Sequence, residues 1–391
     1  MSAYALGVDL GTTYSAAAVA RGADVTALQL GTETATTPSV VVVRPGGEVL
    51  IGDAAERRSA AEPTRTARER KRRLGDPVPM VLGDDAYAIE RLMALQLGDI
   101  VRRATEQEGA PPTTVVLTHP ANYTSFKLGK LREVAGLAGL DAEQVMLLPE
   151  PEAAAVAYSR ARPVERGELV AVYDFGGGTF DAALIARTDR GFELIGTPEG
   201  MERLGGIDFD EAVLAHVDRA VSGGLSATDA SDPGTLTSLA QLRVECRRAK
   251  EALSADADTT IPVAVPGVGA DVPLTRTEFE AMIRPRVAQT IEALERTIAS
   301  AGKHTEDVSR VLLVGGDPRF ARIGGLFVQP FGAADPRSAR YLRRARLIAV
   351  PAPLASSLGI SVGAPIRIET DGRSVSVPLG IQLQENDIGA L

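Results

Sequence analysis

The amino-acid sequence predicts an α/β protein with two lobes, and three observations carry that prediction. The chain has 391 residues, which is more than one hydrophobic core usually organises. The run YALGVDLGTTYSAAAVA reads as strand, glycine turn and strand, and the same plan returns around Asp174, which takes the place of Asp9. Apolar β-type runs also alternate with helical stretches, a pattern typical of α/β layers. The chain is therefore expected to contain two related cores.

Each expected core begins with a strand, a glycine turn and a strand, at 4–20 and again at 168–187. Residues 113–139 and 308–327 then each read as a buried strand, a turn and a helix. The stretches between these units are less regular, and the second of them holds a long helical pattern from Leu236 to Leu253. We therefore expect subdomains inserted into two related cores.

These units set the expected domain boundaries. Lobe I is expected at 1–165, with a core of 1–35 and 111–165 and an inserted subdomain at 36–110, and lobe II at 166–363, with a core of 166–206 and 286–363 and an inserted subdomain at 207–285. Residues 364–391 hold two or three short β-type runs and form a tail to which we give no role. No peptide-binding domain is expected after it.

The charge of the chain narrows the classes of partner. It carries 42 basic and 51 acidic residues, a net charge of −9, which argues against a nucleic-acid-binding surface. The N-terminal run MSAYALGVDL lacks the basic region of a signal peptide, and no long apolar run of membrane-spanning length occurs. We expect no nucleic-acid partner, no membrane segment and a cytoplasmic location.

The run AVYDFGGGTFDAALIAR contains three consecutive glycines, Gly176 to Gly178. Glycine costs backbone entropy, so such a run favours a turn whose amides approach a ligand closely. Successive N–H groups form an anion-binding concavity, the Thr179 hydroxyl adds a donor, and Asp174 lies where a phosphate-bound Mg²⁺ needs a carboxylate. An isolated glycine triplet is more often a flexible hairpin turn. The second copy, Asp9 with Gly11-Thr12-Thr13, favours two turns that hold one polyphosphate across a cleft.

Two further glycine turns and one glutamate are weaker candidates. Gly205-Gly206 and Gly315-Gly316 each adjoin an ordered segment and suit close approach of a ribose or an α-phosphate. Glu150 precedes a proline at the start of a helical pattern. Its carboxylate could order an attacking water or could simply cap the helix, and the sequence leaves both open.

Seven motifs together resemble a known family. GVDLGTTYSAAAVA, TTPSVVVV, LPEPEAAAVAY, VYDFGGGTFDAAL, LGGIDFDEAVLAH, RRAKEALS and RVLLVGGDPR occur in the order seen in the ATPase domain of Hsp70 chaperones, within the actin, hexokinase and Hsp70 superfamily. The resemblance covers roughly residues 4 to 360. It implies a two-lobed actin-like ATPase fold with duplicated ribonuclease H-like cores, and ATP or ADP with Mg²⁺ in the cleft between the lobes.

The resemblance also implies roles for individual residues. The implied catalytic residues are Lys71, Glu150, Asp174 and Thr179. The implied metal site consists of Asp9, Asp174 and Asp181, acting through waters. The implied nucleotide contacts are Gly11, Thr12, Thr13, Gly176, Gly177, Gly178, Gly205, Gly206, Lys250, Ser254, Gly315, Gly316 and Arg319. Lys71 lies in the basic run Arg68 to Arg73, and such a run is more often a solvated face than a phosphate contact.

The chain departs from the family pattern at several positions. Arg247 stands where a glutamate is usual, and Asp317-Pro318 replace the common Ser-Thr after the double glycine. VPAPLASSLGISV lacks the usual Asn-Pro-Asp-Glu motif, and Lys127-Leu128 stand near the usual arginine of the interdomain relay. Arg247 and Asp317-Pro318 are expected to reduce or reshape adenine affinity, and the missing motif is expected to change the last contacts between the nucleotide and its lobe.

The expected function is that of an Hsp70-like ATP-binding module with a weak ATPase activity. Its nucleotide state would control a protein partner, such as a cochaperone-like regulator, or a further C-terminal region. Two alternatives from the same superfamily stay open. One is a nucleotide-binding pseudoenzyme that has kept the fold and lost turnover, and the other is an actin-like filament-forming ATPase.

Overall fold

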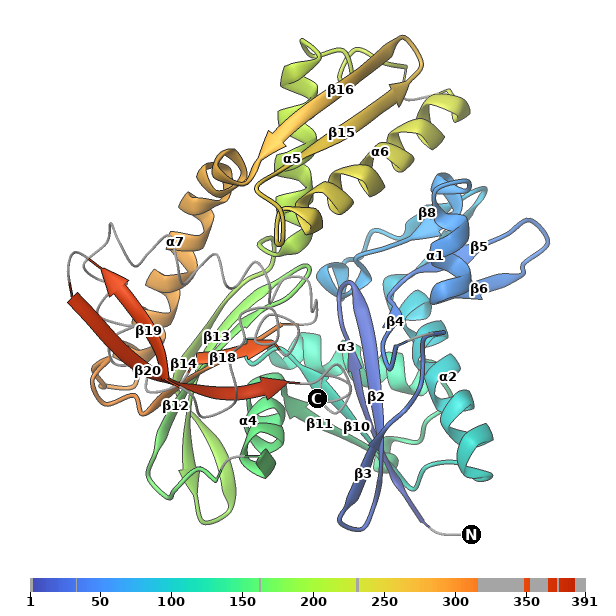
Figure 1. The fold of residues 1–391 in the computed structure, drawn as a ribbon. Helices are drawn as coiled ribbons and strands as arrows, with labels where there is room; N and C mark the ends of the chain where they lie inside the picture. Colours follow the sequence, from blue (N-terminus) through green and yellow to red (C-terminus); the bar gives the residue numbers. More distant parts are fainter. Residues whose placement is uncertain are drawn as a thin grey trace.

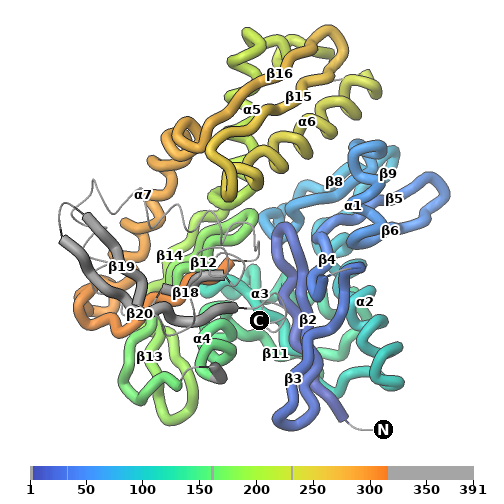
Figure 2. Tube along the Cα trace, viewed as in Figure 1, coloured from blue at the N-terminus to red at the C-terminus, as the bar shows by residue number. Residues whose placement is uncertain are grey.

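The computed structural model describes residues 3–32, 34–161, 163–229, 232–315, 348–351, 365–370 and 373–383. Two separate sheets form the centre of the molecule (Figure 1). Figure 2 shows that the blue to cyan part of the tube builds one sheet and the green to orange part builds the other. The order of elements along the chain therefore divides the two sheets between consecutive halves of the sequence.

The first sheet has the strand order β11-β10-β1-β2-β3, with β4 paired to β2. Its strands are β1 (Ala5–Leu10), β2 (Tyr14–Arg21), β3 (Asp24–Ala27), β4 (Thr37–Pro38), β10 (Thr114–His119) and β11 (Val145–Pro149). β1 pairs with β2 in the antiparallel sense and with β10 in the parallel sense. Alternate side chains of β1, including Leu6 and Val8, are buried in one core with Leu97 and Ile100 of α2 (Ile89–Glu108). The two-residue period of the strand thus fixes which face α2 covers.

The second sheet repeats the arrangement of the first, with the strand order β14-β13-β12-β17. Its strands are β12 (Leu169–Phe175), β13 (Phe180–Thr188), β14 (Gly191–Met201) and β17 (Arg310–Val314). β12 pairs with β13 in the antiparallel sense and with β17 in the parallel sense, as β1 does with β2 and β10. The repetition expected from the sequence is therefore confirmed in the sheets.

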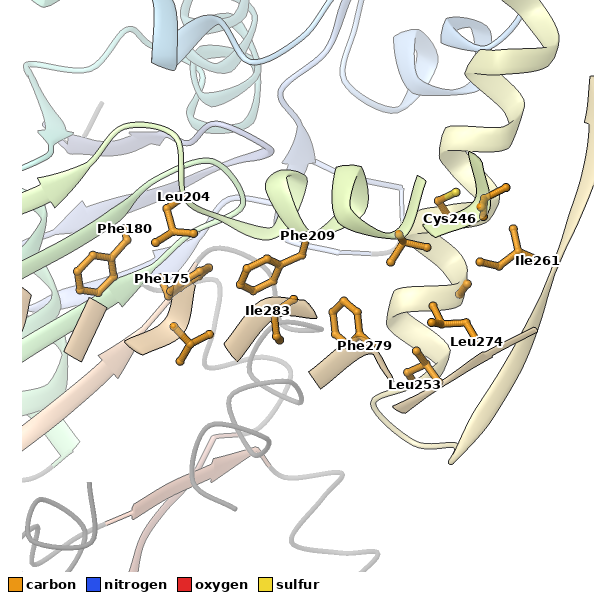
Figure 3. Close-up of a cluster of buried hydrophobic side chains, with 14 of the residues drawn as sticks. Phe175, Phe180, Leu204, Phe209, Cys246, Leu253, Ile261, Leu274, Phe279 and Ile283 are labelled. Atoms are coloured by element: carbon orange, nitrogen blue, oxygen red, sulfur yellow. The ribbon is translucent and has the colours of Figure 1, made fainter. Parts of the chain in front are cut away.

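An aromatic core joins the second sheet to the helices beside it (Figure 3). Phe175 and Phe180 of the sheet, Phe209 of α5 (Gly206–Ala220) and Phe279 of α7 (Arg276–Ser300) are all buried. The ring centroids of Phe175 and Phe209 lie 5.5 Å apart, within the range of favourable aromatic pairs. α5 begins at one of the predicted glycine turns, so this packing also fixes where that turn lies.

The remaining elements form two groups, one in each half of the chain (Figure 1). The first group comprises β5 (Val41–Val43), β6 (Val49–Ile51), α1 (Asp53–Ser59), η1 (Pro63–Arg65), β7 (Thr66–Ala67), η2 (Arg70–Arg73), β8 (Met80–Leu82) and β9 (Asp85–Tyr87). The second comprises α5, α6 (Pro233–Ala252), β15 (Asp258–Val265) and β16 (Val268–Thr275). α6 contacts η1, so the two groups meet. The predicted domain boundaries stay predictions.

Helix α6 begins where local chemistry favours it. The Asp232 carboxylate accepts a hydrogen bond from the Thr235 amide at 2.7 Å, and Pro233 occupies the first helical position. The helical pattern predicted from Leu236 to Leu253 is confirmed as far as Ala252, and Leu253 is the C-cap residue. The single cysteine, Cys246, is buried in this helix among apolar side chains, where burial raises the pKa of its thiol to about 12.

The other helices complete the two halves. They are α3 (Ser125–Leu137), η3 (Ala142–Gln144) and α4 (Glu150–Ala161). Near the end of the chain β18 (Ile348–Pro351), β19 (Pro365–Thr370) and β20 (Arg373–Leu383) form a sheet with the order β18-β20-β19. Within the described ranges, no helix combines the length and apolarity needed to cross a membrane.

Candidate active site

The two glycine turns that repeat in the sequence meet in the structure. A Cβ atom added to Gly177 would lie 1.8 Å from the Thr13 hydroxyl oxygen, and one added to Gly178 would lie 2.2 Å from Cγ2 of Thr12. Real Cβ atoms do not approach other atoms so closely, so a larger residue at either position would have to displace a threonine. The turn between β1 and β2 therefore lies directly against the turn between β12 and β13. This contact brings together predicted residues that are far apart in the sequence.

The third glycine turn, at the start of α5, packs onto the triple-glycine turn. The Gly206 amide donates to the Gly176 carbonyl at 3.2 Å, and the Ile207 amide donates to the Gly177 carbonyl at 2.8 Å. A Cβ on Gly205 would lie 2.6 Å from the Gly177 carbonyl carbon. The start of α5 thus packs directly against the triple-glycine turn, and both segments belong to the second half of the chain.

Lys71 lies at the centre of the acidic residues around these turns. Its Nζ lies 2.7 Å from Oε1 of Glu150 and 3.6 Å from Oδ1 of Asp9. Its side chain is only 10% exposed, which shows that it does not belong to a solvated basic face. Burial lowers the pKa of Lys71, but the charges of Glu150 and Asp9 outweigh burial and raise it above its usual value. Lys71 therefore stays a cation at neutral pH.

The carboxylates of the site are crowded and shielded from water. Asp174 and Asp181 are direct cross-strand partners on β12 and β13. Burial, with Glu150 and Asp181 close by, raises the pKa of Asp174 well above its ordinary value. Burial likewise raises the pKa of Asp181 to about 7, and it raises that of Glu150 although Lys71 opposes the shift. A site with this many buried acids favours a cation beside them.

The acids suit a hydrated cation better than a directly ligated one. Across the described ranges, no three His, Cys, Asp or Glu side chains lie close enough together to hold a metal ion directly. Asp9 accepts a hydrogen bond from the Thr118 hydroxyl at 3.2 Å, which fixes one carboxylate oxygen. Carboxylates are the hard oxygen donors that Mg²⁺ prefers, and Mg²⁺ usually keeps several waters. The donor set thus fits Mg²⁺ bound through its waters.

Two predicted nucleotide contacts have hydroxyls that lack a protein partner. The Thr13 and Ser254 hydroxyl oxygens are buried without a hydrogen bond to any residue that the structure describes. A buried polar group left without a partner costs about 1–3 kcal/mol. A phosphate at Thr13 and a nucleoside hydroxyl at Ser254 would satisfy these atoms. This observation favours a polar ligand that reaches both positions.

Lys250 has protein partners in this structure. It is buried, its Nζ lies 2.6 Å from Oδ1 of Asp210, and it donates to the Gly206 carbonyl at 2.9 Å. These contacts tie α6 to the start of α5. Of its three N–H donors, these contacts leave one for a ligand. Its predicted contact with the nucleoside stays a prediction.

Arg247 forms an ion pair that the sequence analysis did not predict. Its guanidinium lies 3.1 Å from Oε1 of Glu56 on α1, and Arg68 lies 2.6 Å from Oε2 of the same carboxylate. Because α1 and α6 belong to different halves of the chain, Glu56 links the two groups of elements above the sheets. Sequence reasoning had no signal for Glu56, because the pair joins residues far apart in the chain.

Arg72 is a second contact that the sequence analysis missed. Its Nε donates to the Gly178 carbonyl at 2.6 Å, and its guanidinium also pairs with Asp208 of α5 and, at 2.8 Å, with Glu69. The basic run had been expected to contribute Lys71 alone. The side chain of Arg72 is 12% exposed and that of Lys71 is 10% exposed. The contacts of each side chain in the fold, and not its place in a basic run, therefore decide whether it is buried.

A small cavity of about 10 Å³ lies beside the acids, with room for about one water molecule. Lys71, Thr179 and Asp181 are among the residues that line it. A hydrogen bond from Thr179 to Asp181 opposes the rise in the pKa of that acid. The cavity thus places the predicted catalytic Lys71 and Thr179 around a space of the size of a water.

Some predicted residues cannot be placed in the site. Gly315 follows directly after β17, whose Val314 pairs with Asp174. Gly316 and Arg319, and the departures Asp317 and Pro318, lie outside the described residues.

Comparison with known proteins agrees with the sequence motifs. The family model described as "Hsp70 protein" matches residues 5–81 and 78–339. "Heat shock 70 kDa protein BIP3" of Oryza sativa subsp. japonica is 32% identical over 361 residues, which are 85% of this chain and 53% of that protein. The chain thus spans about half the length of this curated relative. Its mixed α/β architecture is consistent with the actin-like ATPase fold of Hsp70 proteins. The chain belongs to the Hsp70 family.

Proposed function

We propose that the chain is an ATP-binding module of the Hsp70 type that binds Mg-ATP between its two halves and hydrolyses it slowly. The observation that carries the proposal is the contact between the Thr12-Thr13 turn and the Gly177-Gly178 turn beside Lys71. Two anion-binding turns from two sheets can hold one polyphosphate from both sides. Membership of the Hsp70 family supports the choice of ATP.

Each group around the turns has a proposed task in binding. The backbone amides of the two glycine turns hold the phosphates, and the Thr13 hydroxyl, which has no hydrogen bond to a described residue, gains a partner. Asp9, Asp174 and Asp181 hold Mg²⁺ through its waters, and the ion neutralises charge on the phosphates when bound. Ser254, Lys250 and Gly315 lie on the nucleoside side. Gly316 and Arg319 keep the same proposed role from the sequence motifs alone.

Lys71 and Glu150 have the proposed tasks in the chemistry. Lys71 already contacts two carboxylates, and its remaining N–H is free to contact the γ-phosphate. Glu150, whose pKa burial raises, accepts a hydrogen bond from the attacking water, and the Thr179 hydroxyl helps to orient that water. Phosphoryl transfer to water depends mainly on positioning and electrostatics, so a slow rate agrees with this set of residues.

The bound nucleotide is proposed to act on a protein or a segment outside the nucleotide site. The module would control a protein partner or a further C-terminal region through the relative positions of its two halves. Arg72 and Glu56 contact both halves, so the position of one half depends on the other. A cytoplasmic location stays a prediction.

Calorimetric titration of ATP with Mg²⁺ into the wild type and an Asp174→Asn variant tests the proposal, followed by phosphate release from the same samples. We expect wild-type binding with slow release, and release at least about tenfold slower in the variant because the metal waters lose a carboxylate. Asp189→Asn is the matched control, because its side chain is 69% exposed in the turn between β13 and β14.

The outcomes separate the candidate functions. Binding without release in the wild type would favour the pseudoenzyme. ATP-dependent light scattering on the same samples would favour filament formation. No ATP binding at all would overturn the nucleotide site.

A further inference from the structure

Among the described residues, Arg70 is a buried cation without a carboxylate partner. It is only 4% exposed, and its guanidinium donates to the Leu92 carbonyl at 3.3 Å and to Oε1 of Gln96. In the part of the chain that the structure describes, no Asp or Glu forms an ion pair with it. Burial lowers the pKa of Arg70 to about 9, so it still carries its charge at neutral pH.

The neighbours of Arg70 in η2 show how unusual this is. Lys71 pairs with Glu150, Arg72 with Asp208 and Glu69, and Arg73 with Asp76 at 2.9 Å. Arg70 is the most buried of the four, and its partners within the described ranges are all neutral. Leaving a buried charge uncompensated costs several kcal/mol. Such a residue therefore points to an anion other than the carboxylates of the described residues.

A chain of hydrogen bonds connects Arg70 to the first glycine turn. The Gln96 amide that accepts from Arg70 donates to the Ser15 hydroxyl at 3.0 Å. Ser15 lies 3.0 Å from the Ser39 hydroxyl, which donates to the Gly11 carbonyl at 2.7 Å. Every side chain in this chain is buried. The position of Arg70 is thus linked to the backbone that carries Thr12 and Thr13.

Arg70 also lines a cavity together with a residue of that turn. Arg70, Lys71 and Gly11 line one cavity of about 10 Å³, which has no room for more than about one water. Little solvent therefore separates the charge from the turn, and in such surroundings charges act over longer distances than in water.

We propose that Arg70 is a positioning residue for the polyphosphate of the nucleotide, and that the bound phosphates supply the negative charge that Arg70 lacks in the ligand-free protein. The inference rests on the proposed function, because it assigns a ligand to the same turn. It also specifies what Arg70 recognises, which is the number of negative charges and not the adenosine. The contribution of Arg70 to binding affinity therefore increases from adenosine to ADP to ATP.

Binding of adenosine, ADP and ATP to the full chain, measured by calorimetry, tests the inference. In an Arg70→Met variant we expect ATP affinity to fall roughly tenfold, ADP affinity to fall less, and adenosine affinity to stay the same. Gln96→Glu keeps the arginine and places a carboxylate against it, so it should weaken ATP binding similarly. Arg70→Lys retains the charge and most of the affinity. Arg73→Met removes a nearby charge that already has a partner, and should change nothing.

Melting temperatures without ligand give a second readout. Arg70→Met and Gln96→Glu should melt at or above the wild-type temperature, because a buried uncompensated charge has been removed or paired. The melting temperature of both variants should rise less than that of the wild type when ATP is added.

Three results would overturn the inference. The first is that the ratio of ATP affinity to adenosine affinity in Arg70→Met and in Gln96→Glu equals that of the wild type. The second is weaker ATP binding in Arg70→Met with unchanged binding in Gln96→Glu, since that would indicate packing instead of charge. The third, no ATP binding by the wild type, would overturn the proposed function together with the inference, whereas the first two leave the proposed function intact.

Discussion

At the scale of single residues, the site is defined by charges whose ionisation depends on one another. Lys71 lies between Glu150 and Asp9, while Asp174 and Asp181 face each other across two strands. Each acid has its pKa changed by burial first and by its charged neighbours second, where a shift is resolved. The protonation of one acid therefore affects the others, and mutation of one should change the pH dependence of the folded protein.

Asp181 gives a pH-dependent stability that can be measured. Its pKa is about 7 in the folded protein and about 3.9 in an unfolded chain. Between these values the folded state holds the extra proton, so stability falls as pH rises. Urea denaturation of the ligand-free Asp181→Asn variant should show it more stable than the wild type at pH 8, on the order of 2–4 kcal/mol, with the difference closing near pH 4.

The exposed Asp189→Asn variant is the control for this measurement, and it should follow the wild-type curve at every pH. A difference for Asp181→Asn that is the same at pH 4 and pH 8 would contradict the prediction. Such a result would indicate a packing effect without a proton.

At the scale of elements, η2 shows how a short turn can direct four consecutive basic side chains to four surroundings. A 3₁₀ turn has about three residues per turn, so successive side chains point in different directions. Arg70 points into the core, Lys71 reaches Glu150, Arg72 reaches Gly178 and Arg73 reaches Asp76. The sequence shows only a basic run here, because periodicity over four residues cannot separate a buried side from a solvated one. The sequence interpretation of Lys71 as a buried contact could therefore be tested only by the folded structure.

The glycine turns allow a matched pair of substitutions. Gly177→Ala places a methyl group on Thr13, which should destabilise the protein by about 1–3 kcal/mol and weaken ATP binding. Gly129→Ala, inside α3, places the same methyl group in open space and removes a flexible residue from a helix. It should stabilise the protein by about 0.5–1 kcal/mol and leave ATP binding unchanged. Urea denaturation and calorimetry of both variants check the prediction, which normal ATP binding by Gly177→Ala would contradict.

At the scale of the whole molecule, contacts between the two halves should control how long a nucleotide stays bound. Glu56 on α1 pairs with Arg247 on α6, and both side chains are about one quarter exposed. A pair of this exposure contributes about 0.2–1 kcal/mol. Glu56→Gln should therefore raise the dissociation rate of a fluorescent ATP analogue by no more than about fivefold, as measured by stopped flow.

Glu211→Gln is the matched control for that measurement. It breaks an ion pair with Arg243 between α5 and α6, which belong to the same half of the chain. Its dissociation rate should equal that of the wild type. Equal rates for Glu56→Gln and the wild type would show that the Glu56 pair does not hold the two halves together.

The sequence by itself determined the α/β class, the repeated strand–turn–strand unit and the family, because each of these follows from patterns of residues that lie close together in the chain. Strand period, glycine runs and turn chemistry act over a few residues, so Asp9, Asp174 and the glycine turns could be recognised without a fold. Only the tertiary structure decided that Arg70 is buried beside Leu92 and Gln96, that Arg72 donates to the Gly178 carbonyl, and that Glu56 pairs with Arg247. Each of these depends on residues that are distant in the chain and meet only in the folded protein. The sequence shows which residues carry a charge. Which groups surround each charge is decided only when the chain folds.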